Sequence, residues 1–195
     1  MTGIIPIVNL TNKQILTQDN YLSLGIKTLA FSLEALLIKP GFQILIRQKS
    51  LKAFVGWPFN IMLIAPNTQF LKIKSPFDGS YIENPQEEID KLINKLDPNI
   101  YELNNASLSP NITAKPLLLA QEGKFYAQNQ VFNLLDSKHK TLFSPLSTNC
   151  TCPTCKRKLT QAYLHHLLSA VPLLAERYLG LHNLTLHYDA LNLQK

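Results

Sequence analysis

The chain of 195 residues has a hydrophobic fraction of 46%, a mean hydropathy of −0.01 and a formal net charge of +6. These values are typical of a soluble globular protein that buries one substantial core. No basic segment precedes an apolar one in residues 1–10, and charged residues, Pro and Gly interrupt the apolar run 29–46. We therefore expect a cytoplasmic protein with reduced cysteines, rather than a secreted or membrane protein.

The positive charge is concentrated in two regions. Residues 1–75 hold eight basic and two acidic side chains, residues 76–110 hold two and seven, and residues 111–195 hold nine and four. Such an excess suits contact with a polyanion such as RNA. The densest basic cluster is Lys156, Arg157 and Lys158, although a short basic run is more often a solvated surface.

The first half of the chain predicts alternating helices and strands, as in α/β folds. Thr17 is a good N-cap for a short helix that stops at Gly25. The apolar residues 28–33 and 60–66 predict two buried strands. The other elements expected here are a turn at Pro40–Gly41, a helix at 42–48 and a turn at 78–80.

The clearest helix signal begins at Asn84. We expect Asn84 to cap the helix and Pro85 to occupy its first position, with Glu87 and Glu88 facing the positive end of the helix dipole. The expected buried stripe is Ile89, Leu92, Ile93 and Leu96. After Asp97-Pro98 ends the helix, we expect a short strand at 100–103 and a loop at 104–111.

The last third predicts a hairpin followed by helix. Two apolar runs within residues 117–135 suggest hairpin-like strands that carry Phe125, Tyr126, Val131 and Phe132. Thr160 is a plausible cap for an apolar helix that Pro172 kinks or splits. We expect Gly180 to end this helix and to turn the chain toward His182.

All three cysteines lie within six residues, in the string CTCPTC at 150–155. The two-residue spacing between Cys152 and Cys155 lets two sulfurs reach one tetrahedral ion, and thiolate with imidazole suits zinc. Four protein ligands would fill the coordination shell, which makes the metal structural. Ordinary buried, reactive or disulfide-bonded thiols are the rival interpretation. The spacing leaves the fourth ligand open among His139, His165, His166, His182 and His187.

Three strings together resemble one known family. CTCPTC at 150–155, AYLHHL at 162–167 and HNL at 182–184 resemble the zinc subdomain of tRNA-guanine transglycosylases, the queuine tRNA-ribosyltransferase family. The resemblance implies zinc bound by Cys150, Cys152, Cys155 and His182. The histidine lies one residue further from the last cysteine than the family pattern has it.

The resemblance extends to earlier segments in family order. LG at 24–25, KPG at 39–41, LKAFVGW at 51–57 and DGS at 78–80 are similar to strings of the family, as is the segment 123–146. Members of this family are (β/α)8 TIM barrels, which take roughly 200 to 250 residues. Fewer than 150 residues precede Cys150, so the resemblance implies an α/β protein with an incomplete barrel. We expect a partial TIM-barrel-like region at 1–115 and a hairpin and zinc-binding helical subdomain at 116–195.

The aspartates on which the chemistry of this family depends are missing. The family uses one aspartate as a covalent nucleophile and another as general acid or base. The resemblance places Ala106 at the position of the nucleophile and Ile64 at the position of the general acid or base, so no catalytic residue is predicted. We expect a catalytically inactive, truncated relative linked to tRNA queuosine modification.

Three functions are compatible with these observations. The first is an accessory protein that pairs with a full-length transglycosylase subunit or with itself, and that contacts tRNA. The second is an active base-exchange transferase that uses Asp78, Asp97 or Glu102. The third is a zinc-stabilised RNA-binding module in which Lys138 and Lys140 join the cluster at 156–158.

Overall fold

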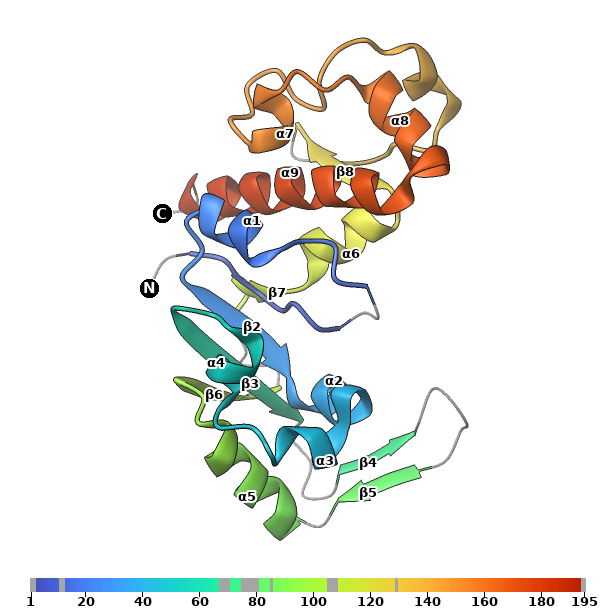
Figure 1. Ribbon diagram of the computed structural model, residues 1–195. Coiled ribbons are helices and arrows are strands. Elements are labelled where there is room, and N and C mark those ends of the chain that lie inside the picture. Colours follow the sequence, from blue (N-terminus) through green and yellow to red (C-terminus); the bar gives the residue numbers. More distant parts are fainter. Residues whose placement is uncertain are drawn as a thin grey trace. The chain divides into compact units, whose positions relative to one another are not determined.

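A computed structural model describes residues 3–10, 13–66, 71–74, 81–84, 86–104, 109–128 and 130–193 (Figure 1). The chain divides into two compact units. We call residues 5–12 and 27–112 the sheet unit, and residues 1–4, 13–26 and 113–195 the cysteine unit. Within the described ranges, no helix is both long and apolar enough to cross a membrane.

The sheet unit is built on a parallel sheet of three strands in the order β2-β3-β6. These strands are β2 (Thr28–Ser32), β3 (Asn60–Pro66) and β6 (Ile100–Asn104). Parallel strands are covered on both faces, which explains why β2 and β3 are apolar without alternation. The three predicted strands and the α/β class are therefore confirmed, with ends that shift by at most one residue.

Four helices and two short strand pairs complete this unit. The helices are α2 (Leu33–Leu36), α3 (Phe42–Leu45), α4 (Leu51–Val55) and α5 (Gln86–Leu96), of which α2 and α4 pack on β3. Strands β4 (Leu71–Lys74) and β5 (Tyr81–Asn84) form an antiparallel pair, and β1 (Ile5–Pro6) pairs with β7 (Ile112–Thr113). The described strands thus form an open three-stranded sheet with small satellite ladders.

Two helix predictions in this unit need correction. Helix α5 begins at Gln86, one residue after the expected first position at Pro85, and Asn84 is the last residue of β5, where it is paired with Leu71. The predicted helix at 42–48 is the shorter α3, which ends at Leu45. The predicted buried stripe of α5 is confirmed at Ile89, Leu92 and Leu96. The predicted turn at 78–80 and residues 105–108 of the predicted loop at 104–111 lie outside the described residues.

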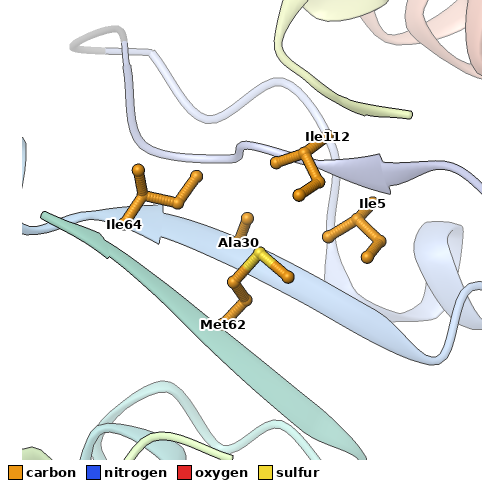
Figure 2. Packing of buried hydrophobic residues seen from close by; sticks show 5 residues of the cluster. All are labelled: Ile5, Ala30, Met62, Ile64 and Ile112. Atoms are coloured by element: carbon orange, nitrogen blue, oxygen red, sulfur yellow. The ribbon is translucent and has the colours of Figure 1, made fainter. Parts of the chain in front are cut away.

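One face of the sheet carries an apolar core cluster. Ala30 of β2 and Met62 and Ile64 of β3 pack against Ile5 and Ile112, which come from the two ends of this unit (Figure 2). Register brings Ala30 beside Met62, so that their side chains point to the same face. Burying each large apolar side chain stabilises the fold by about 1.5–3 kcal/mol. Position 64 is therefore part of the core and is 4% exposed.

The cysteine unit is arranged around one long helix, α9 (Pro172–Leu193), which is red in Figure 1. Packed against it are α6 (Lys115–Gln121), α7 (Pro153–Lys156), α8 (Gln161–Ala170) and strand β8 (Lys124–Ala127). Strand β9 (Gln130–Asn133) pairs with β8, and a 3₁₀ turn follows at Ser137–Thr141. The predicted Thr160 cap is confirmed, since its side chain accepts from Tyr163 N at 3.2 Å. The short helix α1 (Gln18–Ser23) follows Thr17 as predicted.

The predicted hairpin-like strands that carry Phe125, Tyr126, Val131 and Phe132 are confirmed, but the first apolar run of the segment 117–135 is not a strand. The second apolar run forms β8 and β9, but residues 117–121 belong to helix α6. Pro116 lies in the first turn of α6, where proline needs no amide hydrogen bond. Leu117 and Ala120, three residues apart, are buried, and α6 packs on α9. Tertiary packing therefore selects helix for a segment whose apolar run also suits a strand.

Gly180 does not end the last helix, which is a further correction. The residue lies inside α9, and the helix continues past His182 to Leu193. A Cβ atom at this position would lie 3.1 Å from Ile15 Cδ1 and 3.6 Å from Leu16 Cδ2. The glycine therefore allows residues 15–16 to approach the backbone of α9 closely.

Changing Gly180 to valine is expected to destabilise the protein by about 1–3 kcal/mol, because two added methyl groups overpack against Ile15 and Leu16. Urea denaturation followed by circular dichroism measures the effect. Gly180→Ala is the graded control, since alanine gains about 1 kcal/mol in helix propensity against a smaller clash. An unchanged stability of the valine variant would show that this contact is loose.

Candidate metal centre

Four side chains from two distant parts of the chain meet in the cysteine unit. Cys150 precedes α7, Cys152 is its N-cap, Cys155 lies within it, and His182 lies on α9. Their sulfur and nitrogen atoms all lie within 4.8 Å of one another, and all four residues are buried. The three cysteines form no disulfide bond.

Local backbone geometry turns the cysteine sulfurs toward one point. Cys152 is extended, with φ −62° and ψ 158°, and Pro153 begins the short helix α7 directly after it. Cys152 N donates to Cys150 Sγ at 3.4 Å, and Cys155 N donates to Cys152 Sγ at 3.3 Å. These two contacts fix the directions in which the sulfur atoms of Cys150 and Cys152 point.

Helix α7 is held against α9 by a buried hydroxyl. Thr154 Oγ1 donates to Tyr178 O at 2.7 Å, and Thr154 is fully buried. Tyr178 lies one turn before His182 on α9. This hydrogen bond therefore sets the distance between the cysteines and the histidine.

The imidazole of His182 is oriented by a main-chain carbonyl. Its Nε2 lies 2.7 Å from Tyr126 O of β8, which can only accept, so Nε2 carries the proton in the neutral ring. Nδ1 then faces Cys152 Sγ at 3.5 Å and Cys155 Sγ at 3.4 Å. A metal-binding histidine commonly donates its other ring N–H to a carbonyl in this way.

The cluster is built to hold a positive charge. Burial by itself lowers the pKa of His182, but hydrogen bonds to the three cysteine sulfurs and the charge of Cys152 outweigh it and raise the pKa to about 12. The sulfurs thus stabilise a cation among them. A divalent metal supplies that charge more effectively than a proton on Nδ1 does.

The donor distances fit tetrahedral zinc. Bonds of about 2.3 Å to sulfur and about 2.0–2.1 Å to nitrogen place these atoms about 3.5–3.6 Å apart. The sulfur–nitrogen distances of 3.5 and 3.4 Å agree with this geometry. Three thiolates and one imidazole are also the ligand types of structural zinc sites.

The other histidines lie outside this cluster. His139 is 3% exposed and places Nδ1 2.7 Å from Gln161 Oε1. His187 stacks on Tyr126 with ring centroids 6.0 Å apart. Burial, with Lys115 nearby, lowers the pKa of His187. His165 and His166 lie on α8, where neither joins the four donors. The structure therefore groups His182 with the cysteines.

Comparison with known proteins agrees with this grouping. Residues 112–192 match the family model of queuine tRNA-ribosyltransferase, and this range contains all four donors. Over these residues the chain is similar to the queuine tRNA-ribosyltransferase family. The match to the family model does not extend beyond residues 112–192.

Curated queuine tRNA-ribosyltransferases resemble a still shorter segment. The protein of Francisella tularensis subsp. novicida is 39% identical over 70 residues, which are 36% of this chain and 19% of the relative. The protein of a Cyanothece species is 40% identical over 70 residues, which are 36% of this chain and 18% of the relative. The aligned segment thus spans about a fifth of the length of these relatives.

Asn183, for which the sequence predicted no role, stabilises the surroundings of the four donors by hydrogen bonds. Asn183 is fully buried, and its Nδ2 donates to Pro116 O at 3.1 Å and Lys124 O at 3.0 Å. Its Oδ1 accepts from Tyr126 N at 3.1 Å. The same amide thus joins α9 to α6 and to the β8 residue whose carbonyl orients His182. Its place in the HNL string was the available signal.

The other predicted site residues are dispersed. Lys156, Arg157 and Lys158 are exposed at the end of α7, and Lys138 and Lys140 are exposed on the 3₁₀ turn. Ile64, expected at an aspartate position of the family, lies in the apolar core of the sheet unit. Asp97 and Glu102 are exposed, and Asp97 follows α5 with φ 46°. Ala106 and Asp78 lie outside the described residues.

Proposed function

We propose that this chain is a zinc-binding protein of the transglycosylase type that contacts tRNA, assists queuosine modification and does not exchange tRNA bases by itself. The observation that carries the proposal is the complete set of four buried donors within the residues that match the family. Cys150, Cys152, Cys155 and His182 would hold zinc, whose filled shell ties α7 to α9. Zinc in this site supplies stability rather than Lewis-acid chemistry.

The absence of base exchange is inferred from the chemistry of position 64. A general acid or base needs a carboxyl group that can exchange a proton, whereas Ile64 is apolar and packed among Ala30, Met62 and Ile112. The carboxylates of Asp97 and Glu102 are exposed to solvent, whereas catalytic acids and bases commonly lie in clefts that partly exclude water. We infer an accessory role, with a full-length transglycosylase or a second copy as the partner.

The fold is consistent with part of a barrel. The parallel order β2-β3-β6, with helices between the strands, corresponds to consecutive units of a (β/α)8 TIM barrel. We propose that residues 1–115 are the partial barrel and that residues 116–195 are the zinc-binding subdomain. A cytoplasmic location follows from the proposed contact with tRNA.

An RNA-binding module without a partner is the second candidate. The exposed basic residues that favour it are Lys138, Lys140, Lys156, Arg157 and Lys158. Its signature is tRNA affinity that falls steeply as salt rises. Affinity for tRNA without affinity for a transglycosylase would favour this candidate over the accessory role.

Incorporation of labelled guanine into tRNA tests the proposal. We expect no incorporation by the purified zinc-loaded protein, and co-purification of a full-length transglycosylase or tRNA from the native cell. Incorporation that Asp97→Asn or Glu102→Gln abolishes would overturn the inactive assignment. Recovery of neither partner would overturn the accessory role.

A further inference from the structure

Two of the three arginines of this chain line one pocket beside the metal centre. The pocket of about 340 Å³ lies in the cysteine unit between α1, α7 and α9. Arg157 reaches it from the end of α7 and Arg177 from α9, with Asn20, Tyr178 and Pro153 in the wall. We call it the arginine pocket. The remaining arginine, Arg47, lies in the sheet unit.

The two guanidinium groups have no carboxylate partner in the described part of the chain. The ion pairs found there join Lys13 to Glu176, Lys124 to Glu122 and Lys138 to Asp136. Asp19 also lines the arginine pocket, but it pairs with neither arginine, and the two cations outnumber it. Guanidinium groups left free in a concave wall are suited to a bidentate oxyanion.

A second pocket adjoins the first. It measures about 260 Å³ and shares Ser23 and Pro153 with the arginine pocket. Its wall mixes the apolar side chains of Ile4, Leu24, Ile26 and Leu184 with the polar side chains of Lys156 and Thr185. A recess of mixed lining next to an arginine-lined recess suits a nucleotide, because a base has flat apolar faces and polar edges and is joined to a charged phosphate.

We propose that the arginine pocket binds the phosphate group of a nucleotide, whose base or sugar lies in the adjoining pocket. Two kinds of molecule carry such a phosphate group next to a base, namely a free nucleoside monophosphate and a nucleotide within RNA. The site requires neither a partner subunit nor base exchange, so it goes beyond the proposed function. The proposal also separates the members of the basic cluster. Arg157 lines the arginine pocket and Lys156 lines the adjoining pocket, whereas Lys158 lines neither.

The three arginines make the test direct, because each contributes one side-chain Nε–H signal to an NMR spectrum of the zinc-loaded protein. Titration with guanosine monophosphate is expected to shift the signals of Arg157 and Arg177 and to leave Arg47 unchanged. The same titration with a short RNA hairpin distinguishes the sources. Shifts with the mononucleotide alone assign the site to free nucleotides and argue against the RNA contact of the proposed function. Stronger shifts with the hairpin assign it to RNA.

Matched variants measure the contribution of each arginine. Arg157→Gln and Arg177→Gln are each expected to weaken binding of the mononucleotide about tenfold, because each removes a charge-assisted hydrogen bond. Their effects should be coupled in the double variant, since both side chains hold one phosphate. The double lysine variant retains charge but loses the bidentate geometry, so only partial recovery is expected. Arg47→Gln is the control.

Three results would overturn the inference. These are no shift of either arginine signal with any phosphate-bearing probe, equal shifts of all three signals, and equal losses in Arg47→Gln and the pocket variants. Full recovery in the double lysine variant would likewise indicate a general charge effect rather than a phosphate site.

Discussion

Replacing Cys152 by serine is expected to abolish zinc binding and to unfold the cysteine unit. Cys152 supplies a sulfur to the cluster, accepts from Cys155 N at 3.3 Å and lies 3.5 Å from Nδ1 of His182. Structural zinc contributes about 10–16 kcal/mol of binding energy in small zinc domains. A whole domain is stable by only about 5–15 kcal/mol. Loss of the ion therefore removes an amount comparable to the entire stability of the unit.

Metal content by mass spectrometry and thermal unfolding by calorimetry measure this effect. The wild-type protein should carry one zinc per chain, and a strong chelator should lower its unfolding temperature as the substitution does. Thr151→Ala is the matched control, because Thr151 is exposed between two of the cysteines. A Cys152→Ser protein with a full zinc content and the wild-type unfolding temperature would contradict the assigned centre. So would a stably folded, zinc-free wild-type protein.

Replacing Asn183 by alanine is expected to destabilise the protein by about 3–5 kcal/mol. The side chain is fully buried and makes three hydrogen bonds, to Pro116 O, Lys124 O and Tyr126 N. Its removal leaves three main-chain groups without this partner, and a buried polar group without a partner costs about 1–3 kcal/mol. The substitution also loosens β8, whose Tyr126 carbonyl orients His182, so zinc affinity should fall as well.

Urea denaturation and a competitive zinc titration measure the two consequences. Asn149→Ala is the control, because Asn149 is exposed in the loop that precedes Cys150. We expect the control to change stability by less than about 0.5 kcal/mol. Equal stabilities of the two variants would show that the amide of Asn183 does not join α9 to α6 and β8.

Most regular elements could be predicted because their signals are local. The strand at 60–66 is an uninterrupted apolar run, and the stripe of α5 has helical spacing. The predictions were wrong where a local sequence pattern is compatible with two different structures. Gly180 resembles a helix stop, but it is a site of close packing against Ile15. Residues 117–121 suit a strand, but they form a helix because α9 offers an apolar surface.

The sequence by itself determined the donor chemistry of the candidate metal centre. Three cysteines within six residues bring three sulfur donors close enough to share one ion, because their spacing is short enough to be set by local backbone geometry. The family resemblance already implied His182 as the fourth donor, and the tertiary structure groups it with the cysteines. Only the tertiary structure decided what Asn183 holds together and that Arg177 lies beside Arg157. These outcomes depend on how α9 packs against segments up to about 160 residues away in the chain, as in the pair Lys13–Glu176. Such contacts follow from the packing of the whole unit, and no short string of residues encodes them.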